Sequence, residues 1–148
     1  TLADYLPRKK LLIEAKPQAR FQISSQLSRA VVSLLGRHQA QGRVIIDSFD
    51  EFLATSIKQQ CDCQVGLDTP SQKVLTDADL EHYRQLGVDW IYVEQSVVNA
   101  DLIRSAHARD LKVMAYTVNE QTTLDLWRAQ GALPDGVITD YEAISRGQ

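Results

Sequence analysis

The chain has 148 residues, of which 44% are hydrophobic and 24% are charged, a composition typical of one globular domain over residues 1–148. Its net charge of −3 argues against a nucleic-acid partner, and the basic run at residues 8–10 is too short to change that. No stretch approaches the roughly 18 apolar residues of a membrane span, and no signal peptide opens the chain. We therefore expect a soluble, cytoplasmic domain.

The first predicted strand covers residues 11–16, an apolar run that ends in Glu14, Ala15 and Lys16. Side chains alternate between the two faces of a strand, so Glu14 and Lys16 should point the same way. Pro17 ends the strand, because it has no amide hydrogen and disfavours helix in the residue before it. The pattern predicts an acid and a base aimed at one spot, although a simple ion pair at the end of a strand would give the same sequence.

Apolar residues at helical spacing between positions 23 and 35 then predict a helix, with Ser24 or Ser25 as its N-cap. The next helix starts near residue 49 and places Phe52, Leu53 and Ile57 on one side. Two later helices, 76–87 and 99–110, should be capped by Thr76 and Asn99, and a further helix covers 120–131. The strands between and after these helices are predicted at residues 43–49, 63–69, 88–94, 111–119 and 134–140, and a short helix follows the last one.

Two cysteines, Cys61 and Cys63, lie one residue apart. Their spacing is far from that of a zinc ribbon and places the two thiols poorly for bonding to each other. We expect reduced thiols without a bound metal, as in a cytosolic protein.

Six strands that alternate with helices predict an α/β fold with a parallel sheet, either a doubly wound open sheet or part of a (β/α)8 barrel. Polar residues fall at the carboxyl ends of these strands, the edge where ligands bind in both kinds of fold. They are Glu14, Lys16, Ser48, Asp68, Glu94, Thr117, Asn119, Thr139 and Asp140. Asn119 and Asp140 precede helices, and capping would explain them equally well.

Several segments, taken in order, resemble the glycerophosphodiester phosphodiesterase family. IEAK resembles that family's IEIK motif, and AYTVN resembles its WTVN motif. The segments that carry the resemblance are residues 1–6, 13–16, 43–50, 102–120 and 134–144. The resemblance implies a (β/α)8 barrel of the TIM-barrel type, with about six of its eight strand-helix units, the third to the eighth, present in this chain.

The resemblance also implies metal-dependent hydrolysis of glycerophosphodiesters to glycerol 3-phosphate and an alcohol, with Mg²⁺ or Ca²⁺ as the cation. Glu14 matches the family's metal ligand and Lys16 the lysine that faces the phosphate. Tyr116, where the family usually has tryptophan, and Asn119 are expected to bind substrate. A hard cation prefers carboxylate oxygens and can polarise a phosphoryl oxygen, while an ammonium offsets the remaining negative charge.

The sequence also departs from the family. Its His-Arg-Gly motif, the acidic pair of its second strand and its His-Asp motif are absent, so no catalytic residue is assigned in this chain. The three histidines, His38, His82 and His107, lie on predicted helices, and His107 is expected to be structural. We therefore expect the isolated chain to be inactive, because the family's acid and base are both missing.

Two other interpretations stay open at this point. One is a non-catalytic binding or assembly module derived from the same barrel. The other is an unrelated doubly wound domain with Asp47, Asp68 or Asp140 at its ligand edge, although no glycine-rich phosphate loop supports it. Six barrel strands would leave two unpaired edges, so a preceding segment or a second copy of the chain is expected to complete the barrel.

Overall fold

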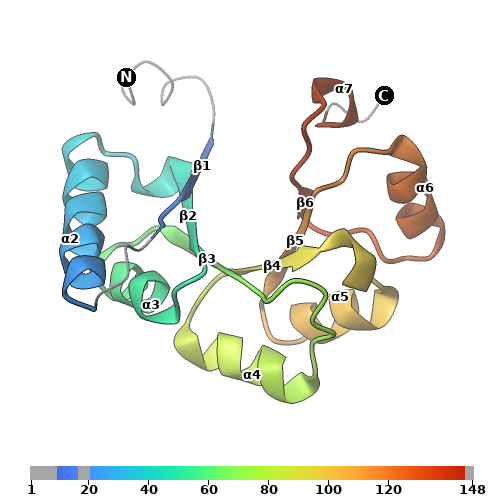
Figure 1. The fold of residues 1–148 in the computed structure, drawn as a ribbon, viewed down its shortest axis with the longest axis horizontal. Coiled ribbons are helices and arrows are strands. Elements are labelled where there is room, and N and C mark those ends of the chain that lie inside the picture. The colour runs from blue at the N-terminus through green and yellow to red at the C-terminus, as the bar shows by residue number, and fades with distance from the viewer. Residues whose placement is uncertain (1–9, 17–20, 146–148) are drawn as a thin grey trace. The chain divides into compact units, whose positions relative to one another are not determined.

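The computed structural model describes residues 10–16 and 21–145, which form two compact units. Of the described residues, the first unit contains 10–16, 21–68 and 86–89, and the second contains 69–85 and 90–145. Each unit contains three parallel strands with helices in their connections (Figure 1). The predicted alternation of strands and helices is confirmed.

In the first unit, β2 is the central strand and pairs in parallel with β1 and β3. The register places Glu14 of β1 beside Asp47 of β2, and Asp47 beside Gly66 of β3. Helices α2 and α3 pack against each other beside these strands (Figure 1). The elements are β1 (Leu11–Glu14), α2 (Phe21–Arg37), the short 3-10 helix η1 (Gln41–Arg43), β2 (Val44–Ser48), α3 (Glu51–Gln60) and β3 (Gln64–Asp68).

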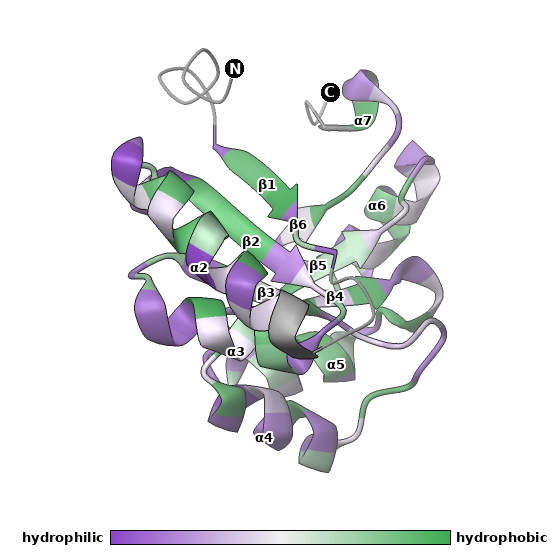
Figure 2. Ribbon diagram, turned by 60° about the vertical axis from the view of Figure 1, so that its left-hand side comes forward, coloured by the Kyte–Doolittle hydropathy of each residue, from purple (hydrophilic) through white to green (hydrophobic). Residues whose placement is uncertain are grey.

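The apolar residues of these strands and helices form the core of the first unit. Figure 2 shows β2 as hydrophobic along most of its length and hydrophilic at its carboxyl end. Ile46 of β2 is fully buried, as are Leu53 and Ile57 of α3. Such near-continuous apolar runs are expected in parallel strands that are covered on both faces. The core therefore fixes the strands whose polar ends carry the candidate site.

In the second unit, β5 is the central strand and pairs in parallel with β4 and β6. Ile91, Tyr92 and Val93 of β4 are fully buried, as is Val113 of β5. The elements are α4 (Asp77–Leu86), β4 (Trp90–Glu94), η2 (Gln95–Val97), α5 (Ala100–His107), β5 (Lys112–Tyr116), α6 (Gln121–Ala129), β6 (Gly136–Val137) and α7 (Glu142–Ser145). Every predicted strand is present, and β6 is much shorter than its predicted range.

The predicted caps of two helices are confirmed. Asp79 accepts hydrogen bonds from the amide of Thr76 at 2.8 Å and from its hydroxyl at 2.7 Å, and Thr76 Oγ1 accepts the amide of Asp79 at 3.2 Å. Asn99 Oδ1 accepts the amide of Leu102 at 2.9 Å. Gly87 follows α4 with φ = 75°, the left-handed conformation that glycine adopts without strain.

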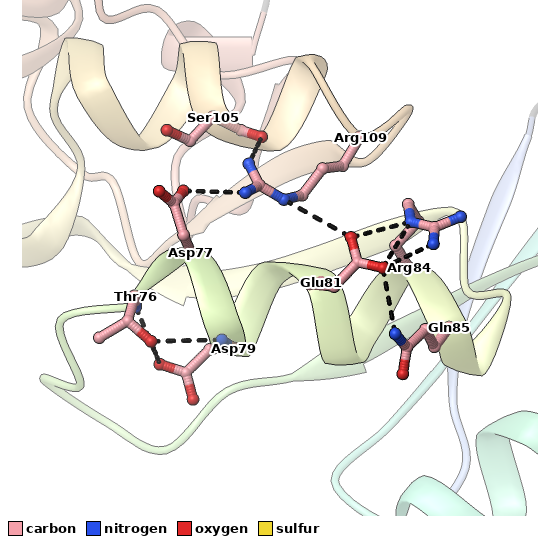
Figure 3. Close-up of polar contacts among 8 residues, drawn as sticks. All are labelled: Thr76, Asp77, Asp79, Glu81, Arg84, Gln85, Ser105 and Arg109. Carbon is pink, nitrogen blue, oxygen red and sulfur yellow. Dashed lines mark hydrogen bonds and ion pairs between the residues drawn. The ribbon is translucent and has the colours of Figure 1, made fainter.

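Arg109 ties α4 to the end of α5. Its guanidinium lies 3.1 Å from Asp77 and 3.9 Å from Glu81, and it donates to the carbonyl of Ser105 at 2.9 Å (Figure 3). Glu81 is also paired with Arg84 one turn along the same helix. One arginine therefore holds two consecutive helices of the second unit in a fixed relation.

The prediction that Cys61 and Cys63 are reduced thiols is wrong, because the structure joins them in a disulfide. The chain bends at Asp62 between α3 and β3, which brings the two Cα atoms within 5.2 Å, a separation that suits a disulfide. Disulfides are typical of oxidising compartments, so the cysteines no longer support a cytosolic setting, and the cytoplasmic location stays a prediction.

Three smaller predictions are also corrected. The helix α2 begins at Phe21, so Ser24 and Ser25 lie inside the helix and are not its N-cap. Phe52 is 38% exposed, because the buried side of α3 is formed by Leu53, Ala54 and Ile57. His38 lies in the turn after α2 and not on a helix.

Pro17, predicted to end the first strand, lies outside the described residues, as do residues 1–6 of the family resemblance. Within the described part of the chain, no helix is both long and apolar enough to span a bilayer.

Candidate functional site

The prediction that Glu14 and Lys16 point the same way is confirmed, and the two side chains also form the ion pair that was the alternative interpretation. Glu14 ends β1, and the Lys16 ammonium lies 3.3 Å from its Oε2. Ala15 between them is 6% exposed, whereas the side chains of Glu14 and Lys16 are 35% and 76% exposed. The strand alternation therefore buries the alanine and presents an acid and a base together on the other side.

Hydrogen bonds fix the chain at this point. The amide of Ala15 donates to the carbonyl of Asp47 at 2.8 Å, which extends the β1–β2 ladder by one residue. The buried hydroxyl of Ser48 donates to the carbonyl of Ala15 at 2.7 Å and accepts the amide of Asp50 at 3.1 Å. Ser48, which the sequence placed at a strand end, thus holds the position of the Glu14–Lys16 segment and has no free donor for a ligand.

Two further carboxyl groups lie at the same edge of the first unit. Asp47 is the register partner of Glu14, so both side chains lie on the same face of the sheet. Asp68 is two residues beyond Gly66, the register partner of Asp47, and therefore lies diagonally across from Asp47 on that face. Asp47 is only 4% exposed. Asp47 Oδ1 and Asp68 Oδ2 are buried and have no hydrogen-bond partner among the described residues.

This crowding of acids changes their proton affinities. Burial, followed by repulsion from Glu14, raises the pKa of Asp47 to about 6. Burial, followed by repulsion from Asp47 and Glu14, raises the pKa of Asp68 to about 7. Lys16 lowers both values, but by less. When Asp68 is protonated, its carboxyl group can donate a hydrogen bond to Asp47. The two side chains can therefore share one proton near neutral pH.

These groups suit a hard divalent cation, because they are carboxylate oxygens, and two of them are buried with no hydrogen-bond partner among the residues described. Within residues 10–16 and 21–145, no three histidine, cysteine, aspartate or glutamate side chains are arranged to hold a metal ion. Mg²⁺ is often held by one or two carboxylates, with waters and substrate phosphates as its other ligands. Glu14 and Asp47 are the residues that could take that role here.

In the second unit, Asn119 joins the chain after β5 to the chain after β6. Its Nδ2 donates to Asp140 Oδ2 at 2.8 Å, and its Oδ1 accepts the amide of Asp140 at 3.0 Å and the hydroxyl of Thr139 at 3.2 Å. The hydroxyl of Tyr116 lies 3.5 Å from the carbonyl oxygen of Thr69. Asn119 therefore positions the loop that carries Asp140, whether or not Asn119 also contacts a substrate.

Glu94, another acid at a strand end, accepts hydrogen bonds from two serine hydroxyls. They belong to Ser71, at 2.5 Å, and Ser96, at 3.2 Å. The Ser71 hydroxyl is the main cause that lowers the pKa of Glu94. Glu94 is therefore favoured in its ionised form and is held by one hydroxyl from the connection after β3 and one from the segment after β4.

The structure thus brings together Glu14 and Lys16, as predicted, and adds Asp47 and Asp68, which the phosphodiesterase interpretation left out. The sequence contained a signal for Asp47, because it is an acid close to the end of a predicted apolar strand, as Glu14 is. The proximity of Asp47 to Asp68 depends on the register of β2 and β3, which no local pattern specifies. Of the histidines, His107 contacts Asp135 through Nε2 at 2.9 Å.

Comparison with known proteins identifies the family of the chain and its fold. Residues 9–143 match the model of the glycerophosphoryl diester phosphodiesterase family. A comparison with curated proteins gave no match.

Several solved structures have a similar fold. A glycerophosphodiester phosphodiesterase from Parabacteroides distasonis is 17% identical with a TM-score of 0.79, over 98% of this chain and 61% of that one. An Oleispira antarctica phosphodiesterase, in complex with the product sn-glycerol-3-phosphate, is 21% identical with a TM-score of 0.72, over 89% of this chain and 53% of that one. The chain thus spans little more than half the length of these structures, and its fold is part of a (β/α)8 barrel.

Proposed function

Because the chain belongs to the glycerophosphoryl diester phosphodiesterase family, we propose that the protein hydrolyses glycerophosphodiesters to glycerol 3-phosphate and an alcohol. The observation that supports this most directly is the placement of Glu14 and Lys16 side by side, 3.3 Å apart, at the carboxyl end of β1. An acid that can bind a cation, next to a base that can pair with an anion, suits a negatively charged phosphodiester. The product bound in the Oleispira antarctica structure is of the proposed chemical class.

In this proposal Glu14, with Asp47 beside it, holds Mg²⁺ or Ca²⁺. The cation, when bound, would polarise a phosphoryl oxygen and offset its charge. Lys16 is the most exposed member of the group and orients the phosphate through its ammonium. Tyr116 provides an aromatic surface for the glycerol moiety, and Asn119 holds the loop next to it.

Hydrolysis also needs a base to activate water and an acid to protonate the leaving alcohol. His82 and His107 lie on helices and His38 lies in the turn after α2, so none of them follows a strand. We expect the 148 residues alone to show no turnover, with the family's histidines supplied by further chain.

An exposed strand edge agrees with that expectation. Among the described residues of the first unit, β1 pairs only with β2, and its Leu12 is 42% exposed. An edge of this kind presents unpaired backbone groups that another strand can join. We propose that a further segment of the polypeptide, or a second copy of the chain, pairs there.

The test is turnover of glycerophosphocholine by the natural gene product, with Mg²⁺ or Ca²⁺ and with a chelator. Glu14→Gln should lower kcat/KM by about a hundredfold, because a cation at a phosphoryl oxygen is worth several kcal/mol of transition-state stabilisation. Lys16→Gln should mainly raise KM. Glu51→Gln, which removes an exposed carboxylate in the first turn of α3, is the matched control and should have no effect.

Equal losses in the Glu14 and Glu51 variants would refute the assignment of Glu14. If the natural product binds glycerol 3-phosphate but never turns over a diester, the non-catalytic binding or assembly module is the better interpretation.

A further inference from the structure

A cavity lies at the opposite edge of the first unit from Glu14. Its volume is about 300 Å³, and its lining includes Lys10, η1 and the start of β3. Lys10 directly precedes β1, and η1 directly precedes β2. All three strands are parallel, so these elements share the amino edge of the sheet, whereas Glu14 ends β1 at the carboxyl edge. The cavity is therefore separate from the proposed catalytic group.

The charges around this cavity do not balance. Three cationic side chains line it, from Lys10, Arg43 and Lys58, against the two carboxylates of Asp62 and Asp89. Lys58 is neutralised by Asp89, since its ammonium lies 2.7 and 2.9 Å from the two carboxylate oxygens. Lys10 and Arg43 form no ion pair with any residue that the structure describes. Two cations thus face a single remaining acid.

One wall of the cavity is held rigidly. Asp89 Oδ2 also accepts the amide of Val65 at 2.8 Å, and the Lys58 ammonium reaches the carbonyl of Cys63 at 3.3 Å. The disulfide between Cys61 and Cys63 fixes the same turn. The charges of Lys58 and Asp89 neutralise each other within this network. An anion in the cavity would therefore contact Lys10 and Arg43.

We propose that this cavity binds a small phosphate-bearing anion through Lys10 and Arg43, at a site distinct from the one that Glu14 and Lys16 form. A guanidinium can hold two phosphate oxygens at once, and the ammonium adds a second positive charge. The volume exceeds that of inorganic phosphate and admits a small phosphate monoester. A cation is disfavoured, because only one of the two acids lacks an ammonium partner.

The experiment is a site-resolved NMR titration of the full-length protein with inorganic phosphate, at constant ionic strength maintained with chloride. The amides of Gly42 and Gln64 report on this cavity, and the amide of Lys16 reports on the carboxyl edge. Saturable shifts of Gly42 and Gln64 are expected. Arg43→Gln should weaken the affinity read from them by about tenfold or more, as for a lost charge-assisted hydrogen bond.

Two controls separate this site from general charge effects and from the proposed catalytic site. Arg37→Gln removes another exposed arginine of the first unit that does not line the cavity, and it should leave the affinity within about twofold. Lys16→Gln should change only the response of the carboxyl edge. The proposal is overturned if the Gly42 and Gln64 shifts do not saturate, or if Arg37→Gln and Arg43→Gln weaken binding equally. Loss of turnover in a Glu14 variant would bear on the catalytic proposal alone.

Discussion

Replacing Asp47 with asparagine should make the protein more stable at neutral pH. Asp47 is 4% exposed, lies next to Glu14 in the sheet and has a buried oxygen that finds no hydrogen-bond partner in the part of the chain that the structure describes. Ionising it in the folded state is unfavourable for these reasons. Asparagine has nearly the same shape and no charge, and its amide can donate a hydrogen bond toward Asp68.

The size of the effect follows from the pKa. Asp47 has a pKa of about 6 in the folded protein, against an ordinary value of 3.8. The difference of about two units corresponds to about 3 kcal/mol, at about 1.36 kcal/mol per unit. The folded state holds this proton more tightly than the unfolded state, so stability is greatest below pH 3.8 and falls as the pH rises toward 6. Asp68, with a pKa of about 7, extends the decline to that pH.

The assay is urea unfolding of the wild type and Asp47→Asn between pH 4 and pH 8, with a chelator present so that no cation stabilises the carboxylates. The gain in the free energy of unfolding should be close to zero at pH 4 and about 3 kcal/mol at pH 8. Asp62→Asn removes an exposed carboxylate of the same unit and should change stability by less than about 0.5 kcal/mol. A variant less stable than the wild type at pH 8, or a gain that does not shrink on acidification, would refute the reasoning.

Three further substitutions test other contacts of the structure. Asp89→Ala should lower the free energy of unfolding by about 2 kcal/mol in urea titrations, since it removes the carboxylate that pairs with the Lys58 ammonium and accepts the amide of Val65. Asp79→Ala removes the acceptor for the amide and hydroxyl of Thr76 and should cost about 1 kcal/mol in the same assay, with faster amide exchange in the first turn of α4. His107→Ala should leave kcat/KM for glycerophosphocholine within about twofold, because its contact is with an aspartate beside β6. A loss of turnover as large as that of a metal-ligand variant would contradict the structural role of this histidine.

The features that were predicted correctly depend on local sequence. Alternation along a strand placed Glu14 and Lys16 on one face, and the structure has them 3.3 Å apart. The caps at Thr76 and Asn99 were equally local, because a cap bonds to amides two or three residues ahead. The family resemblance then extended these local patterns to the barrel fold.

The features that were missed depend on residues brought together by the fold. The proximity of Asp47 and Asp68 follows from the pairing of β2 with β3, which local patterns do not encode. The disulfide depends on a bend at Asp62 that spacing rules for cysteines do not include. Phe52 was placed with the inner residues of α3 although the helix buries Ala54 instead, because tertiary packing decides which side of an amphipathic helix faces inward.

The crowding of Glu14, Asp47 and Asp68 also restricts how this edge of the protein can evolve. Glu14 raises the pKa of Asp47, and both raise the pKa of Asp68, so the effect of a substitution at one position depends on the residues at the other two. A neutral residue at position 47 would lower the pKa of Asp68. It would also leave less negative charge for Lys16 to offset. Positions 14, 16, 47 and 68 should therefore show epistasis, with paired replacements among homologues more frequent than the single changes would suggest.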